Sequence, residues 1–329
     1  MKTIIQTHIN TRAMFHTITR LLNRSAVKVL CSLLLCAGMG TWQTAHAQVT
    51  AGNTPALLEP SATQFFQNQY LGNPAMAGID TGLHINAAYR HQWADVQGSP
   101  ETKFLTADVY AGNRVGLGLN IFNDQAGLIE RTRVGLSYAY HLPLHDPRKQ
   151  LHFGLSLAFN TAYINRKNIN GDASDPSVGR FNQRDNYFEG EYGMAYTDGH
   201  LTLQGALPNV ISLFKKNPNS SVDGGSTYYT AVGYRFTTGN AVSSVEPKVA
   251  YRGVQGYDNI LDMGANIGFL DDMFNITGLY HTTKSFTAGI GFRYKSIAGI
   301  HAFYTSQTGG IKSYVDGTFE VGINIHLFH

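Results

Sequence analysis

Histidine is the side chain of this sequence best suited to acid–base chemistry, and 13 histidines are present. A hydrolytic histidine works against a serine or an aspartate that lies within hydrogen-bond reach. The histidines of the regular segments are spread along the chain and share no local signature: His141, His152, His281, His301 and His326. We therefore expect structural histidines, no catalytic residues and no enzymatic activity.

Metal and cofactor chemistry has little more support. Both cysteines, Cys31 and Cys36, lie near the N-terminus. The oxygen-rich stretch at 168–175 lacks the full spacing and the glutamate of a calcium loop, which favours an ordinary polar loop. No glycine-rich phosphate loop follows a strand and opens a helix. We expect no metal site and no cofactor.

The first 47 residues have the pattern of a secretory signal peptide. Basic residues precede an apolar run at 29–39, and a small-x-small site follows at 45–47. The apolar run is shorter than the about 20 residues that a transmembrane helix needs. We expect cleavage after Ala47, with Met14 as an alternative start.

Removing this leader changes the charge of the chain. Five of the 25 Lys and Arg residues lie in the leader, but none of the 22 Asp and Glu residues does. The mature chain, 48–329, is therefore slightly acidic and free of cysteine. It has no disulfide, and its composition gives no support for a nucleic-acid partner. The full sequence has 35 glycines and 36 Phe and Tyr residues, nearly all of them outside the leader; they fit a membrane barrel, with rings at the interfaces and glycine where the wall crowds.

The elements that would carry these residues are strands. In 319–329 the residues Phe319, Val321, Ile323, Ile325 and Leu327 alternate with polar or small ones. A period of two places the apolar set on one face of a sheet. Further alternating stretches are 83–89, 104–110, 115–121, 134–142, 151–159, 188–196, 201–207, 228–236, 245–251, 261–269, 274–281, 286–295 and 300–304. They predict an all-β fold, a transmembrane antiparallel up-and-down β-barrel of about 14 strands, closed because lipid cannot satisfy an open sheet edge.

The connections between these stretches alternate in length. Every second one is short, whereas most of the others are longer, such as 165–186 and 215–226. The connection at 282–284 is an exception. Outer-membrane barrels have short periplasmic turns and long extracellular loops. We therefore expect a cell outer-membrane location with the short turns in the periplasm, an asymmetry that a soluble β-sandwich would not show.

Five motifs follow one another before residue 160. They are Asn73-Pro74-Ala75-Met76-Ala77-Gly78, Tyr89-Arg90-His91-Gln92-Trp93, Gly98-Ser99-Pro100, Gly116-Leu117-Gly118 leading to Asp124 and Gly127, and Tyr138-Ala139-Tyr140-His141. In order and spacing they resemble the PorP/SprF family of the Bacteroidetes type IX secretion system. Gln69, Gly72 and Met76 depart from the residue types common in that family, which bears on the packing of the N-terminal segment.

The resemblance implies a non-enzymatic barrel that supports export or surface attachment of large secreted proteins, such as adhesins, in some relatives for gliding motility. Its implied partners are outer-membrane lipid, a secreted surface protein with a C-terminal sorting domain, and other type IX secretion components. The alternative is a small-molecule diffusion channel of the fatty-acid-transporter type, which also carries an N-terminal Asn-Pro-Ala segment.

The same motifs allow physical interpretations. We expect three parts: a signal peptide (1–47), an N-terminal periplasmic or plug segment (48–80) and the barrel (81–329). The segment either enters the lumen or packs against the rim. At 89–93, Arg90 and Gln92 form an anchor inside the mouth, or Tyr89 and Trp93 form part of an aromatic belt. Charged residues also occupy strand positions that the alternation places on the inner face. They either line an ion pathway or brace a closed lumen, and their mixed signs favour bracing. They are Arg131, Arg133, Glu189, Glu191, Glu246, Lys248, Arg252, Arg293, Lys295 and Glu320.

Overall fold

The computed structural model describes residues 63–93, 98–146, 148–164, 186–211, 226–239, 241–254, 259–295, 297–306 and 317–328. The expected leader and the oxygen-rich stretch at 168–175 lie outside these residues. Two short 3-10 turns, η2 (Gln69–Leu71) and η3 (Pro74–Met76), come first. The strands are β1 (Leu83–Gln92), β2 (Glu101–Gly112), β3 (Val115–Ala126), β4 (Ile129–Pro143), β5 (Gln150–Ile164), β6 (Tyr187–Thr197), β7 (Leu201–Leu207), β8 (Ser226–Tyr234), β9 (Phe236–Thr237), β10 (Val242–Val254), β11 (Ile260–Phe269), β12 (Phe274–His281), β13 (Ser285–Tyr294), β14 (Ala298–Thr305) and β15 (Thr318–Leu327).

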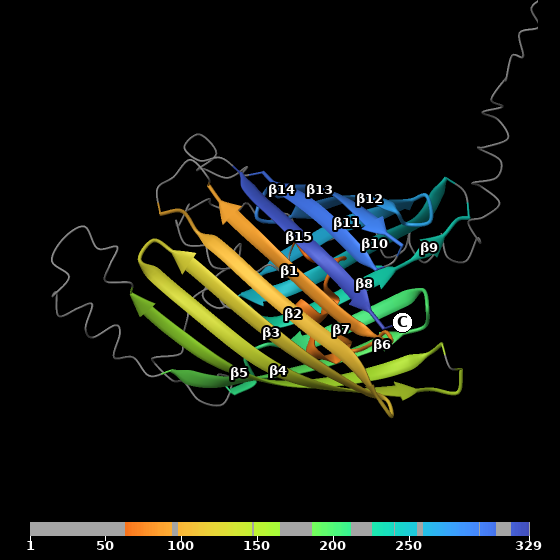
Figure 1. Cartoon of the computed structure of the whole chain (residues 1–329), viewed down its shortest axis with the longest axis horizontal. Coiled ribbons are helices and arrows are strands. Elements are labelled where there is room, and N and C mark those ends of the chain that lie inside the picture. The colour runs from red at the N-terminus through yellow and green to blue at the C-terminus, as the bar shows by residue number, and fades with distance from the viewer. Residues whose placement is uncertain are drawn as a thin grey trace, which may run out of the picture. The chain divides into compact units, whose positions relative to one another are not determined.

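The strands form one closed antiparallel barrel. Apart from the short β9, which pairs only with β10, each strand pairs with the strands before and after it; β10 pairs with both β8 and β11, and β1 pairs with β15. The two-residue β9 continues the line of β8 along β10, so the wall is 14 strands wide, as the alternation predicts. Figure 1 shows the strands slanting side by side, with β15 beside β1.

The barrel carries its apolar side chains outside and its polar ones inside. On β4, β5 and β13 the residues Leu136, Leu155 and Ile290 are 65%, 60% and 67% exposed, whereas Ser137 and Ser156 are only 5% and 7% exposed. This arrangement is the inverse of a water-soluble sandwich and suits a wall surrounded by lipid. Within the described residues, no helix has the length and apolarity needed to cross a membrane.

The two ends of the barrel differ in their connections. At the turn end, where β1 begins and β15 finishes, all connections have between two and six residues. At the loop end, four of seven have eight or more. The expected longer loop near 124–128 is wrong, because β3 and β4 pair as far as Ala126 and Ile129 and only two residues connect them. Gly127 supplies the positive φ of 59° that this tight hairpin requires.

Two further details differ from the alternation pattern. Lys295 does not face the lumen, because β13 ends at Tyr294 and Lys295 is an exposed turn residue with a φ of 48°. Phe328 lies beyond β15 and is 82% exposed.

In the β6–β7 turn, Asp198 accepts hydrogen bonds from the backbone N–H groups of Leu201 at 2.6 Å and His200 at 3.0 Å. These bonds hold the pKa of the Asp198 carboxyl below its usual range.

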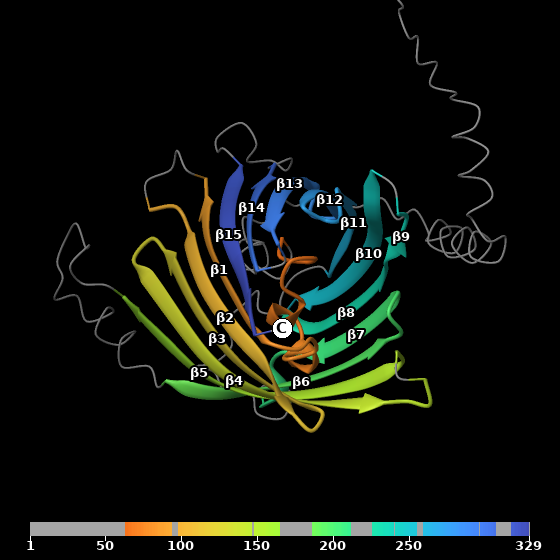
Figure 2. The same ribbon diagram turned by 45° about the vertical axis from the view of Figure 1, so that its right-hand side comes forward.

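Residues 63–80, which we call the lumen segment, lie inside the curve of the wall (Figure 2). Gly78 and Gly82 reach the backbone of Val109 and Leu327, which are close to the turn end. Thr63 contacts Glu320, which lies near the start of β15 at the loop end. The segment therefore runs along the barrel from its loop half to its turn end. The division of the whole chain into leader, segment and barrel remains a prediction.

Candidate functional site: the occupied lumen

Near the turn end, the Asn-Pro-Ala motif of the lumen segment forms a tight backbone turn. Asn73 is extended, with φ −154°, as expected before a proline, and its side-chain Oδ1 accepts a hydrogen bond from the N–H of Ala75 at 3.0 Å. Its Nδ2 donates to the carbonyl of Met194 on β6 at 3.1 Å. Asn73 thus both shapes the turn and attaches it to the wall.

Glycines on the wall receive this turn. A Cβ on Gly154 of β5 would lie 2.2 Å from the nitrogen of Ala75, and one on Gly193 of β6 would lie 2.0 Å from Asn73 Oδ1. A Cβ on Gly116 of β3 would lie 1.9 Å from the carbonyl oxygen of Ala77. Real side chains cannot approach so closely, so three strands need glycine where the segment passes. The Gly-Leu-Gly motif and the Asn-Pro-Ala motif are two sides of one packing contact.

His141, from the Tyr-Ala-Tyr-His motif, lies at the same contact. Its Nε2 is 3.1 Å from the carbonyl oxygen of Ala77, and its Nδ1 is 2.8 Å from Nδ1 of His152. His152 in turn contacts the hydroxyl of Thr197 at 2.9 Å. Directly after this point, the N–H of Gly78 donates to Asp108 of β2 at 2.9 Å.

The middle of the segment is held by single polar contacts. Asn68 Nδ2 donates to Thr106 Oγ1 on β2 at 2.8 Å. The hydroxyl of Tyr70 lies 2.8 Å from that of Ser137 on β4, and Gly118 leaves the space that the Tyr70 ring occupies. Tyr70, Ala75, Met76 and Ala77 of the segment also pack on Ala139 and Ala195 of the wall.

Toward the loop end, the segment contacts charged groups. Glu320 is 1% exposed and accepts hydrogen bonds from Thr63 Oγ1, at 2.5 Å, and from Gln64 Nε2. Arg90 Nε lies 3.7 Å from the same carboxylate. Gln64 Nε2 is also 3.0 Å from Nε2 of His301. Glu320 therefore joins the segment to β1 and β15.

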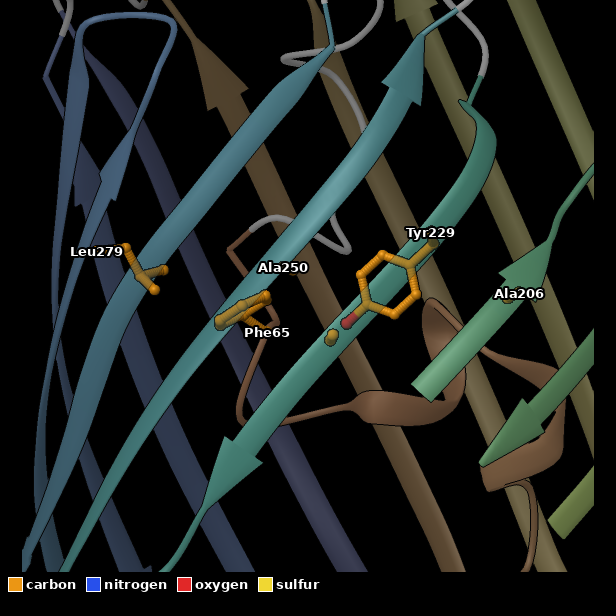
Figure 3. Packing of buried hydrophobic residues seen from close by; sticks show 6 residues of the cluster. Phe65, Ala206, Tyr229, Ala250 and Leu279 are labelled. Carbon is orange, nitrogen blue, oxygen red and sulfur yellow. The ribbon is translucent and has the colours of Figure 1, made fainter. Parts of the chain in front are cut away.

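Lys248 of β10 holds the segment from the opposite wall. Its Nζ donates to the carbonyl oxygen of Phe65 at 2.6 Å and lies 4.7 Å from the centre of the Phe65 ring. The Phe65 ring packs in a cluster with Ala206, Tyr229, Ala231, Ala250 and Leu279, most of which Figure 3 labels. Phe65 is thus the apolar anchor of the loop half.

The remaining motif residues of the loop end form a second group. Gln92 N–H donates to the carbonyl of Pro100 at 3.0 Å, and Gly127 N–H donates to that of Gly98 at 3.0 Å. Asp124 accepts a hydrogen bond from Thr102 at 3.0 Å. These contacts tie the β1–β2 and β3–β4 connections together beside Arg90. Residues about 30 positions apart in the sequence meet here because alternate connections of an antiparallel barrel lie at the same rim.

Four motif residues lie away from the lumen contacts. Tyr89, Tyr138 and Tyr140 are 42%, 49% and 37% exposed on the outer face. Trp93 follows β1 with a positive φ of 50°, and its N–H donates to Gly317 at 3.2 Å. Arg90 and Gln92 face inward and Tyr89 faces outward, whereas Trp93 lies beyond the end of β1. The anchor and the aromatic belt both remain predictions.

The wall also brings together groups that alternation alone could not pair. Asp262 accepts a hydrogen bond from Arg252 at 2.8 Å and contacts His281 at 2.5 Å. His281 Nε2 then lies 2.9 Å from Thr287 Oγ1, which lies 2.7 Å from the hydroxyl of Thr305. The sequence of Asp, His and Thr side chains resembles a hydrolase triad. However, Thr287 is fully buried and its hydroxyl already contacts His281 and Thr305, so this series of contacts braces β10 to β14. Among the described residues, no three His, Cys, Asp or Glu side chains are grouped to hold a metal ion.

The sequence pattern identified the motif residues and several inward charges, but not how they combine. The inward parity of Lys248 and Glu320 was visible, whereas their contacts with Phe65 and Thr63 depend on the path of the segment. The signal for the turn-end contact was the inward glycine on three strands: Gly116, Gly154 and Gly193.

Solved barrels show low-level likeness to this chain. Omp33 of Acinetobacter baumannii is 8% identical, with a TM-score of 0.47, over 76% of this chain and 100% of that one. A KdgM porin is 10% identical, with a TM-score of 0.37, over 75% and 99%. Outer membrane phospholipase A from Escherichia coli is 9% identical, with a TM-score of 0.34, over 74% and 92%. Comparison with curated proteins gives no match.

A family match covers far more of the sequence than the five motifs do. The family described as type IX secretion system membrane protein PorP/SprF matches residues 56–325, which includes the contacting part of the lumen segment and nearly all of the wall. The closed barrel and its apolar outer face place such a protein in the outer membrane. The chain belongs to the PorP/SprF family of type IX secretion system membrane proteins.

Proposed function

We propose that this barrel supports the export or surface attachment of large secreted proteins, such as adhesins, by protein contact rather than by conduction or catalysis. The observation that carries this proposal is the occupied lumen. The described segment contacts inward side chains or backbone of β2 to β7, β10, β14 and β15, and it is attached in both halves of the barrel.

The charges inside the barrel also favour a braced lumen over an ion pathway. Buried or half-buried partners of opposite sign lie on neighbouring or nearby strands, as in Arg252–Asp262 and Arg133–Glu191. A selective pore usually carries a ring biased to one sign. Paired charges neutralise one another and stiffen the wall instead.

The rim that would meet a secreted protein is the loop end, which we place outside the cell. Its longer connections offer more surface than the two- to six-residue connections of the turn end. In this orientation the turn end faces the periplasm and the other components of the secretion system. Partners at the loop end would be proteins with a C-terminal sorting domain, and surface adhesins used for gliding are one such class.

Deletion of the gene, combined with conductance of the purified protein, tests this function. We expect near-zero conductance in planar bilayers and loss of a large surface protein from the deletion strain. The rival, a diffusion channel of the fatty-acid-transporter type, requires steady conductance or uptake of an apolar solute, with surface proteins unchanged. That pair of results would reject the proposal.

The role of the lumen segment is tested separately. A variant lacking residues 49–72 loses Thr63, Phe65 and Tyr70 but keeps every strand of the barrel. We expect higher conductance and faster antibiotic entry than in the wild type. The control is the Tyr89→Phe variant, which changes an outward residue at the loop end and should leave permeability unchanged. Equal permeability of the deletion variant and the wild type would show that the segment does not close the lumen.

A further inference from the structure

A small cavity lies inside the barrel between the lumen segment and the inner face of β12–β15. Its volume is about 70 Å³, and its lining includes Gln67 of the segment, Asn275 of β12 and Arg293 of β13. Ile297 of the β13–β14 turn also lines it, so it lies at the turn end. The volume exceeds the roughly 10–15 Å³ that one water molecule needs. It is large enough for a small polar group and too small for a sugar or a lipid headgroup.

Polar atoms without partners line this cavity. Gln67 Nε2, a donor, and Asn275 Oδ1, an acceptor, are buried and have no hydrogen-bond partner among the residues that the structure describes. The Arg293 guanidinium has no carboxylate partner among the described residues, although its backbone N–H donates to Met273 at 2.7 Å. Buried polar groups are nearly always satisfied, so unpaired ones gathered at one cavity indicate a missing ligand.

The cavity differs in charge from the rest of the lumen. Arg90, Arg133 and Arg252 each lie within ion-pair distance of a carboxylate on the wall. No lining residue of the cavity is acidic, and His301 and His326 line it together with Arg293. Two buried acidic groups of the lumen contact other partners: Glu320 contacts Gln64 and Arg90, and Asp108 contacts His84 and Gly78. The site therefore favours an anion.

We propose that this cavity binds the C-terminal carboxylate of a polypeptide. Arg293 and Gln67 Nε2 supply donors for the carboxylate oxygens. Asn275 Oδ1 supplies an acceptor for the backbone N–H of the terminal residue, a donor that acetate lacks. Capture of a chain end by converging donors and an acceptor is a known mode of peptide recognition. The site is at the end of the barrel opposite the loops, so it does not depend on the proposed function.

N-acetylglycine, acetate and inorganic phosphate are the probes of this site. Each is titrated into the mature protein in detergent micelles, and binding is followed by the thermal unfolding midpoint and by the line width of the 13C-labelled acids. We expect N-acetylglycine to bind several-fold more tightly than either acetate or phosphate. Loss of one charged donor weakens such binding by roughly tenfold or more.

Two variants and a control make the assignment specific. Arg293→Gln should abolish binding, and Gln67→Leu should weaken it while leaving the wall unchanged. Arg131→Gln is the control, since Arg131 is an inward arginine near the loop end of β4 and does not line the cavity. Circular dichroism and heat-modified gel mobility establish that each variant is folded.

Three results would overturn the proposal. Equal binding by the wild type and both variants would show that the cavity is not the site. Tighter binding of phosphate than of N-acetylglycine would reject a carboxylate ligand. Equal affinity for acetate and N-acetylglycine would reject a polypeptide end, because the Asn275 acceptor would then contribute nothing.

Discussion

The two halves of the lumen segment contact the barrel wall by different physical means. Near the turn end, Asn73–Gly78 lies directly on wall backbone, at positions where a Cβ would come within about 2 Å of it. In the loop half, Thr63–Phe65 is held by the tips of side chains, including a buried carboxylate and a buried ammonium. One contact depends on the absence of side chains and the other on their presence.

This difference determines whether each half of the lumen segment can be released from the wall. A contact of backbone on glycine has one geometry, because close-packed atoms cannot shift without a clash. A contact through long polar side chains can be exchanged for water, provided that the charges left behind find other partners. We expect the turn half to be a fixed support and the loop half to be the part that can be released. Variants of the two halves should therefore differ in stability and in accessibility.

Replacement of Glu320 by alanine should give the largest effect. It removes the acceptor of Thr63 and Gln64 and leaves Arg90 buried beside an empty site, which costs about 3–5 kcal/mol of unfolding free energy. Urea unfolding in lipid vesicles measures the loss. Glu101→Ala is the control, because Glu101 pairs with Lys103 at 3.5 Å on an exposed surface, where about 0–1 kcal/mol is expected.

The same variant should release only one half of the segment. The mature chain has no cysteine by our signal-peptide prediction, so single cysteines placed at Thr63 and at Met76 report on the two halves. Glu320→Ala should speed maleimide labelling at position 63 and leave labelling at position 76 slow. Equal acceleration at both positions would mean that the segment moves as one body and would remove the contrast.

Gly154→Ala should rank second and act on the turn half. The new Cβ would meet Ala75 nitrogen and the Pro74 carbonyl carbon at 2.2 and 2.3 Å, and neither backbone atom can move alone. Overpacking of this kind costs about 3 kcal/mol. Gly233→Ala is the matched control on β8, since its Cβ would lie 3.4 Å from the flexible Lys248 side chain. Similar stabilities of the two variants in urea would contradict the glycine contact.

The barrel wall was predictable because each strand carries its own evidence. Alternation in a stretch such as 319–327 depends only on which residues face lipid, so no distant contact is needed to recognise it. The β3–β4 turn was misjudged because Asn123 and Asp124 resemble loop residues, although they pair with Thr132 and Arg131 in the ladder. Polar residues facing a polar lumen are compatible with a strand.

Several residues of the occupied lumen were predictable from the sequence, but the contacts between them were not. The family motifs named Asn73, Gly116 and His141 separately, and nothing in the spacing says that they meet. Their contact follows from the closure of the barrel and from the path of a segment without regular alternation. Lys248 shows the same limit, because parity placed it inside but could not identify the Phe65 carbonyl as its partner.

Lys248→Met should give the third effect, again in the loop half. Methionine keeps much of the apolar stem beside Phe65 but leaves the buried carbonyl oxygen of Phe65 without its donor. An unsatisfied buried acceptor costs about 1–3 kcal/mol. Urea unfolding measures it, and Lys103→Met, at an exposed position, should change stability by at most about 0.5 kcal/mol. A loss no greater than that of the control would show that the ammonium does not hold the segment.

Tyr70→Phe should give the smallest effect, at the boundary between the halves. The hydroxyl of Tyr70 makes one neutral hydrogen bond with Ser137 at 2.8 Å, worth about 0.5–1.5 kcal/mol, while the ring stays packed against Gly118. The Tyr70→Phe, Ser137→Ala and double variants form a cycle whose coupling energy isolates this bond. If the two halves are held independently, Glu320→Ala should leave that coupling unchanged. A coupling that disappears in the Glu320→Ala background would instead mean that release of the loop half extends through Tyr70 toward the glycine contact.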